Sequence, residues 1–285
     1  IVAGCTAEKA DAQTSSPSEA RVEGAPYVLT GTQVWTVPDP VSGRRYEVFV
    51  SLPASYDASP ERRYPVLYVT DADYAFPIIR QMARRLNLDE PVIEDFILVG
   101  LSYAVGEGGM TSRTRDYTPV AINDRTGGGA AYQAYLKSEV LPFIEDRFRA
   151  DPARRMLLGH SYGGLLGAQV LFSEPTLLDG YILGSPSLWF GDHAMMRTEA
   201  EYAESHKDLP ARVYMYIGEY EVPGGERRNN RYDMVGDNAR FEARLASRAY
   251  PGLTLTNEVL NDEDHLSVAP RGFTKGLIAM LPARR

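Results

Sequence analysis

The chain has 285 residues, which is enough to bury a large core, and α/β folds of this length often form one domain. Its formal net charge is −8 at pH 7, which argues against nucleic acid as a partner. Hydrophobic residues make up 44% and charged residues 24%, as in ordinary globular proteins, and no stretch approaches the length of an apolar transmembrane helix.

The first residues point to a processing signal. Cys5 is the single cysteine, so no internal disulfide is possible. Residues 2–5 (Val-Ala-Gly-Cys) resemble the bacterial lipobox, in which the cysteine becomes the lipidated first residue. We therefore expect 1–25 to be a lipobox remnant with a flexible tether and 26–285 to be a single domain. This predicts a lipoprotein of the bacterial periplasm or cell envelope, attached to the membrane only through its lipid. The alternative is a chance cysteine in a disordered terminus.

Apolar patterning divides the rest of the chain into alternating strands and helices. Residues 28–37 and 46–52 alternate as strands do and predict an N-terminal hairpin. Further strands are expected over 65–70, 95–101, 155–158, 181–184, 212–217 and 253–260, and helices over 78–86, 131–147, 164–172, 242–249 and 272–281. Residues 104–130 are polar and glycine-rich and are predicted to form a long loop. The alternation predicts an α/β fold with a mostly parallel, doubly wound central sheet and an N-terminal antiparallel hairpin.

A Gly-His-Ser-Tyr-Gly motif at 159–163 lies between an apolar strand and a helix-like run, the setting of a G-x-S-x-G nucleophile elbow. The small residues let the strand and helix pass closely, and the serine is exposed at a helix N-terminus. Unpaired N–H groups there can receive an oxyanion. Ser161 is therefore the predicted nucleophile, and the N–H of Tyr162 a predicted oxyanion donor. The alternative is an ordinary loop, because glycine and serine are common.

The chain has four histidines, and their order along it narrows the choice of a general base. In this kind of site the acid and the histidine follow the serine. His160 is the variable residue of the elbow and points away from the direction of the serine. His193 and His206 lie in a polar stretch and are not at a metal-ligand spacing, so we expect no metal. Only His265 follows the later strands, in a loop after 253–260, and it is the predicted base; the alternative is a solvated loop histidine.

Two glutamates compete for the role of the acid that orients this histidine. Glu219 and Glu221 both follow the strand 212–217. Glu221 is favoured, because a glycine followed three positions later by an acid suits a turn that swings the side chain back. Asp262 and Asp264 are too close to His265 in sequence to approach its ring easily, and are expected to be solvated.

Four stretches carry a resemblance to a known family: residues 65–69, 158–165, 185–189 and 264–268. Over about residues 26–282 the chain resembles the putative esterase (esterase D-like) family of α/β-hydrolases, which includes enterochelin and related siderophore esterases, feruloyl esterases and mycolyltransferases. Residues 115–119 (Arg-Asp-Tyr-Thr-Pro) and the Gly-x-x-Glu at 218–221 resemble the siderophore-esterase-like branch, and the latter supports Glu221.

The resemblance implies an α/β-hydrolase fold and a serine carboxylic ester hydrolase with a Ser-His-Glu triad, an acyl-enzyme mechanism and no cofactor. It also implies a second oxyanion donor, a backbone N–H just after the third strand. The family often has a glycine there, whereas this chain has Asp-Ala-Asp at 71–73, so the donor is Ala72 or Asp73. An acyltransferase with the same triad and a non-catalytic ligand-binding protein are the alternatives.

The loops after the strands are expected to line the substrate pocket, and they are rich in aromatic residues and arginines. The predicted contacts to a small-molecule ester substrate are Arg115, Tyr117, Trp189 and His160. They suit an aromatic or anionic ester, such as a catecholate siderophore or a hydroxycinnamoyl ester. The alternative is structural: Arg115 and Asp116 pin the long loop, and Trp189 packs beside the elbow.

Overall fold

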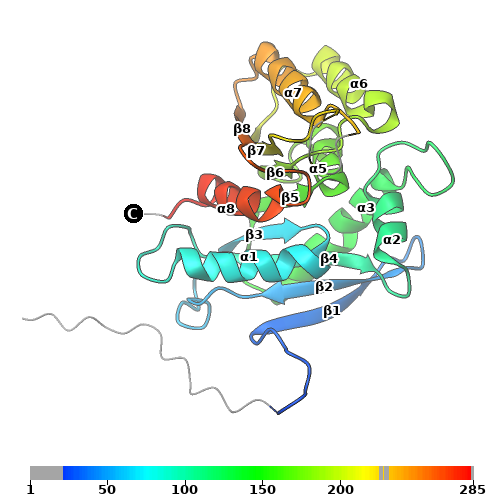
Figure 1. The fold of residues 1–285 in the computed structure, drawn as a ribbon. Helices are drawn as coiled ribbons and strands as arrows, with labels where there is room; N and C mark the ends of the chain where they lie inside the picture. The colour runs from blue at the N-terminus through cyan, green and yellow to red at the C-terminus, as the bar shows by residue number, and fades with distance from the viewer. Residues whose placement is uncertain (1–21, 225–226, 228–230, 284–285) are drawn as a thin grey trace, which may run out of the picture. The chain divides into compact units, whose positions relative to one another are not determined.

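The structure is a computed structural model that describes residues 22–224, 227 and 231–283 (Figure 1). The chain divides into two units between Thr30 and Gly31, and the second unit, Gly31–Arg285, contains the described helices and strands. Cys5 and most of the expected tether lie outside the described residues, so the lipoprotein hypothesis stays a prediction. No helix in the described part of the chain is both long and apolar enough to cross a membrane.

The unit is built on one sheet of eight strands in the order β1-β2-β4-β3-β5-β6-β7-β8. The strands are β1 (Thr32–Pro38), β2 (Arg45–Ser51), β3 (Tyr64–Val69), β4 (Ile97–Ala104), β5 (Ala150–His160), β6 (Gly180–Gly184), β7 (Ala211–Gly218) and β8 (Leu253–Leu260). Strand β2 pairs antiparallel with β1 and with β4, and all other pairs are parallel. This is the mostly parallel sheet with an N-terminal antiparallel hairpin that the sequence predicted.

Helices cover both faces of the sheet. They are α1 (Ala72–Leu86), α2 (Gly109–Asp116), α3 (Gly129–Tyr135), a π-helical turn (Leu136–Val140), α4 (Leu141–Arg147), α5 (Tyr162–Ser173), α6 (Phe190–Ser205), α7 (Met234–Arg248) and α8 (Val268–Met280). Helices α1 and α8 contact each other on one face, and α5 contacts α2, α3 and α6 on the other (Figure 1). Every residue of β3 is buried, as expected for a parallel strand covered on both faces.

Three segments differ from the sequence-based predictions. The predicted long loop over 104–130 is wrong in part, because it contains α2. Helix α6 forms where only a polar stretch was recognised, and α1 begins at Ala72 although Pro77 lies inside it. Helix α2 has no apolar stripe to signal it, and instead its Arg113 pairs with Asp71 and its Asp116 accepts from the hydroxyl of Tyr46, both far away in the sequence. Such contacts leave no local pattern in the sequence.

Six parallel strands, β3 to β8, end at the same edge of the sheet. The segments that follow them therefore converge, as expected for ligand sites in open α/β sheets. These segments include Asp71 after β3, Ser161 after β5, Ser185 after β6, Glu221 after β7 and His265 after β8. All the polar side chains considered for catalysis lie on this edge.

Candidate active site

The turn from β5 into α5 has the geometry of a nucleophile elbow. Ser161 has φ 61° and ψ −118°, a conformation that non-glycine residues adopt only under strain, and α5 begins at the next residue. A Cβ on Gly159 would lie 2.2 Å from the backbone of Gly163, so the strand and helix pass too closely for any side chain there. This is the physical reason for the glycine two residues before the serine.

His265, which follows β8, and Glu221, which follows β7, contact each other. Nδ1 of His265 lies 2.7 Å from Oε2 of Glu221, whose side chain is fully buried. The other carboxylate oxygen, Oε1, accepts hydrogen bonds from the N–H of Gly218 at 2.8 Å and the hydroxyl of Ser185 at 2.6 Å. Because a carboxylate only accepts, Nδ1 of His265 carries the proton and Nε2 is the basic nitrogen.

Glu219, the competing acid, is exposed and turned elsewhere. Its Oε2 accepts from the N–H of Asp262 at 2.9 Å. Of the two candidate glutamates, the structure therefore brings only Glu221 to His265.

The hydroxyl of Ser161 makes no hydrogen bond to His265 in this structure. In the described part of the chain its one hydrogen-bond partner is the hydroxyl of Ser187, with 3.3 Å between the oxygens. The base loop nevertheless lies against the elbow, because Nε2 of His160 is 2.9 Å from the carbonyl oxygen of His265. Catalytic hydrogen bonds between a nucleophile and its base are often long or poorly aligned without substrate and tighten in the substrate complex.

Two helix N-termini meet beside Ser161. The N–H groups of Tyr162, at the start of α5, and of Ala72 and Asp73, at the start of α1, have no acceptor within their helices. The two corners are in contact, since a Cβ on Gly163 would lie 2.1 Å from Oγ1 of Thr70. The three predicted oxyanion donors are thus brought together, and both Ala72 and Asp73 stay candidates for the second position.

A buried ion pair lies next to these donors. Asp71 is 2% exposed and has φ 53°, and its carboxylate accepts from Nε and Nη2 of Arg113 at 2.8 and 3.2 Å and from the Tyr103 hydroxyl at 2.8 Å. Burial alone would lower the pKa of Arg113, but the charge of Asp71 raises it, so the guanidinium stays charged. The guanidinium of Arg113 also lies 5.1 Å from the ring centre of Tyr162, the residue that follows Ser161, so a cation lies beside the elbow.

The residues predicted to contact substrate lie in different surroundings. Trp189 stacks on Tyr232 with ring centres 3.8 Å apart and lies 6.2 Å from the ring of Tyr162, so it belongs to the surroundings of the elbow. Tyr117 is 1% exposed, and its hydroxyl accepts from the N–H of Asp71 at 3.3 Å.

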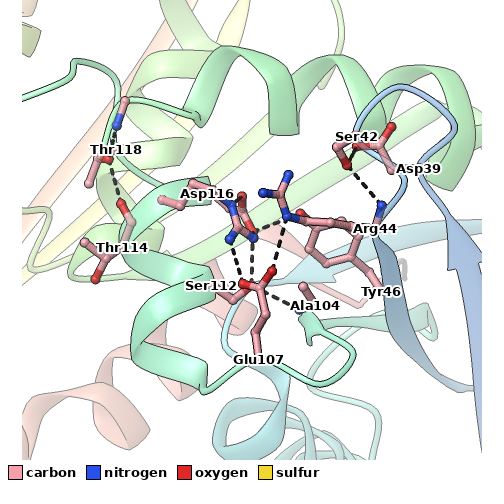
Figure 2. Close-up of polar contacts among 12 residues, drawn as sticks. Asp39, Ser42, Arg44, Tyr46, Ala104, Glu107, Ser112, Thr114, Asp116 and Thr118 are labelled. Carbon is pink, nitrogen blue, oxygen red and sulfur yellow. Dashed lines mark hydrogen bonds and ion pairs between the residues drawn. The ribbon is translucent and has the colours of Figure 1, made fainter. Parts of the chain in front are cut away.

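Arg115 takes part in a polar network with Glu107 and Asp116, which are labelled in Figure 2. It binds Asp116 at 2.8 Å and Glu107 at 2.6 Å, and Glu107 also accepts from Arg44 at 3.2 Å. Asp116 in turn accepts from the hydroxyl of Tyr46 at 3.0 Å. The geometry matches the structural alternative for Arg115 and Asp116, which pin the segment that contains α2 to the hairpin. A role of Arg115 in substrate binding stays a prediction.

Sequence reasoning missed two serines that contact the candidate triad. Ser185 donates to Glu221, and Ser187 contacts Ser161. Both are buried, and Ser185 has φ 37°, a strained value for a residue that is not glycine. The signal in the sequence was Ser-Pro-Ser at 185–187, directly after β6, where the turn orients both serine hydroxyls.

The remaining histidines lie elsewhere. His193 contacts Asp237 at 2.9 Å, and His206 stacks on Tyr202 at 3.9 Å. Within residues 22–224, 227 and 231–283, no three His, Cys, Asp or Glu side chains gather into a group that could hold a metal ion.

Comparison with known proteins identifies the family. The model of the family described as "Putative esterase" matches residues 40–258. The chain belongs to this esterase family. It is 27% identical to the ferri-bacillibactin esterase BesA of Bacillus subtilis, in an alignment that covers 86% of this chain and 87% of that protein.

Solved structures give the same fold. The BES protein from Bacillus cereus has a TM-score of 0.78 and 24% identity, covering 93% of this chain and all of that one. The siderophore hydrolase EstB from Aspergillus nidulans has a TM-score of 0.75 and 23% identity, covering 92% of this chain and 100% of that one. The chain has the α/β-hydrolase fold and is a carboxylic ester hydrolase.

Proposed function

We propose that this esterase hydrolyses a siderophore ester through an acyl-enzyme, with Ser161 as nucleophile, His265 as base and Glu221 as the acid that orients it. The observation that carries the proposal is the 2.7 Å contact between Nδ1 of His265 and the buried carboxylate of Glu221. The backbone of His265 also contacts His160, which precedes the strained Ser161 in the elbow. The chain order Ser-Glu-His is that of α/β-hydrolases.

The mechanism follows from these positions. Ser161 leaves Ser187 and donates its proton to Nε2 of His265 while Oγ attacks the ester carbonyl carbon. The N–H of Tyr162 and that of Ala72 or Asp73 donate to the oxyanion. The imidazolium, stabilised by Glu221, then protonates the leaving alcohol. Water attacks the acyl-enzyme in the same way, which releases the acid and restores the serine.

The substrate class is proposed from two supports. The relative BesA is named a ferri-bacillibactin esterase, and the alignment with it covers most of both chains. In addition, the aromatic rings of Tyr162, Trp189 and Tyr232 lie beside the elbow together with the cation of Arg113. Flat aromatic groups that carry negative charge suit such surroundings, because rings stack on rings and anions pair with a guanidinium.

The test is a panel of p-nitrophenyl, feruloyl and catecholate trilactone esters, assayed with wild type and with Ser161→Ala. We expect the trilactone to have the highest kcat/KM and the variant to lose activity on every ester. A highest kcat/KM on the feruloyl ester would replace the siderophore by a hydroxycinnamoyl ester. Transfer to an added alcohol in preference to water would indicate the acyltransferase, and binding without turnover the non-catalytic protein.

We also propose that the enzyme works in the bacterial cell envelope as a lipoprotein, anchored through Cys5. The support is the lipobox-like sequence at 2–5 alone. Expression of the full precursor followed by fractionation tests it: we expect membrane association that disappears in Cys5→Ser. Unprocessed protein in the cytosol would reject the anchor and leave the triad untouched.

A further inference from the structure

His160 is a buried titratable side chain that the mechanism above does not use. It is 7% exposed, and both ring nitrogens have partners. Nε2 lies 2.9 Å from the carbonyl oxygen of His265, and Nδ1 lies 3.3 Å from the hydroxyl of Tyr216. A carbonyl oxygen only accepts, so Nε2 carries the proton and Nδ1 accepts from the tyrosine. This tautomer is inferred from the partners.

The surroundings keep this ring neutral. Burial lowers the pKa of His160 well below 6.5, and the nearby charges of His265 and Arg113 lower it further, against a smaller opposite effect of the hydrogen bond to the His265 backbone. The rings of His160 and His265 have centres 4.8 Å apart. A neutral His160 therefore adds no positive charge beside the imidazolium that His265 becomes during catalysis.

The partner of Nδ1 is itself held rigidly. Tyr216 is fully buried in β7, and its ring stacks on that of His160 with centres 6.1 Å apart and an angle of 15°. A Cβ on Gly184 would lie 2.0 Å from its hydroxyl oxygen, and one on Gly272 would lie 2.3 Å from its ring. A side chain at either glycine would therefore clash with Tyr216, so the two glycines make room for its ring.

We infer that His160 is a positioning residue for the esterase reaction, which holds the loop of the base His265 against the elbow that carries Ser161. The inference rests on the proposed roles of those two residues. His265 is then fixed at two points, by Glu221 at its ring and by His160 at its backbone carbonyl. Because His160 is covalently next to the nucleophile, its hydrogen bond sets the distance between the nucleophile and the base.

Other hydrogen bonds hold the loop on either side of His265, from the N–H of Tyr220 to the carbonyl of Glu263 and from the N–H of Val268 to the carbonyl of Asp264, but these bonds do not join it to the elbow. His265 is followed by two exposed residues, Leu266 and Ser267, whose N–H groups bind only the carboxylate of Asp264 in the same loop. Without the hydrogen bond from His160, the ring of His265 could still pair with Glu221 while its backbone shifted. A displacement of about 1 Å between reacting groups costs roughly a hundredfold in rate.

The experiment compares His160→Gln with His160→Leu in the full chain. Glutamine can extend an amide N–H to about the position of Nε2, whereas leucine has a similar size and no donor. With a p-nitrophenyl ester we expect His160→Leu to lower kcat roughly ten- to a hundredfold with KM changed by less than about threefold, because positioning affects the chemical step. His160→Gln should restore most of kcat. A full kcat in the leucine variant, or an equal loss in the glutamine variant, would overturn the inference.

Tyr216→Phe supplies an independent variant in case His160→Leu does not fold. It keeps the ring and removes the hydroxyl that fixes the tautomer, so we expect an unchanged fold by circular dichroism and a several-fold lower kcat. An unchanged kcat there would also contradict the inference. The activity of Ser161→Ala separates the two hypotheses: an active Ser161→Ala variant rejects the proposed function itself, whereas an inactive one with a fully active His160→Leu rejects only the role of His160.

Discussion

The two ends of the proposed triad are held differently. Glu221 is fully buried, and its carboxylate accepts from a backbone N–H, a serine hydroxyl and a histidine ring. Ser161 is partly buried, and its hydroxyl has one partner in the described part of the chain, 3.3 Å away. The acid end of the proposed triad is thus fixed before substrate binds, and the nucleophile end is not. The difference suits the two roles. The acid must hold one tautomer and one ring orientation, whereas the serine must move from its resting partner to the base and then form a covalent bond.

Removing the nucleophile should have the largest effect. Ser161→Ala is expected to lower kcat on the order of a thousandfold or more, because the oxyanion donors and the binding surface remain but no acyl-enzyme can form. The fold should be unchanged, since alanine is smaller and keeps the turn. A fluorophosphonate should add once to the wild-type protein, on Ser161, as peptide mass spectrometry can check; a label on another residue would contradict the assignment.

At the fixed end, Glu221→Gln should lower kcat roughly a hundredfold or more, because an amide keeps the shape but cannot stabilise the imidazolium. Glu219→Gln is the matched control, two residues away and exposed, and should change kcat less than about twofold. The measurement is kcat with the same ester for both variants. If the Glu219 variant is the damaged one, the acid is misassigned, and if neither is, the enzyme works as a Ser-His dyad.

Ser185→Ala should weaken the fixed end without removing it. The variant loses one hydrogen bond to a buried carboxylate, while Gly218 and His265 still hold Glu221. Hydrogen bonds to charged groups are worth about 1.5–3 kcal/mol, so a drop in kcat of roughly tenfold is expected, with KM little changed. Ser138→Ala on the surface is the control. A rise in KM alone would show that Ser185 acts on the pocket and not on the acid.

The elbow could be predicted because its chemistry is local. Glycines two positions either side of a serine, between a strand and a helix, leave few other interpretations, and the order of Ser161, Glu221 and His265 followed from the topology. The contacts of Ser185 and His160 could not be predicted, because no motif links Ser185 to Glu221 or His160 to the backbone of His265, which lie 36 and 105 positions apart. The sheet was predicted for the same reason as the elbow, since continuous apolar runs signal buried parallel strands.

Helix α2 shows most clearly what could not be predicted from the sequence. Arg113 and Arg115 are two residues apart, and on an α-helix that spacing turns them about 200° away from each other. Arg115 was one of the predicted substrate contacts, yet Arg113 lies by the elbow and Arg115 in the network with Glu107. A helix without apolar periodicity gives no way to decide from sequence which arginine faces the site.

The smallest effect should come from that network, and on stability alone. Burial by itself would raise the pKa of Glu107, but hydrogen bonds and charges from Arg115 and Arg44 outweigh it and lower the pKa below the usual 4.5. A carboxyl whose pKa is lower in the folded state stabilises the fold above its unfolded pKa, and this contribution is lost as the pH falls through the folded value. Glu107→Gln should therefore lower the free energy of unfolding by about 1 kcal/mol or less at pH 7.

The difference between this variant and wild type should disappear as the pH is lowered well below 4.5, because both side chains are then uncharged. Denaturant unfolding at several pH values measures it, with Glu90→Gln, an exposed residue without a described ion pair, as the control. The kcat should not change, since the described partners of Glu107 are Arg44 and Arg115 and not residues of the proposed triad. A lower kcat at unchanged stability would instead support the prediction from the sequence that Arg115 contacts the substrate.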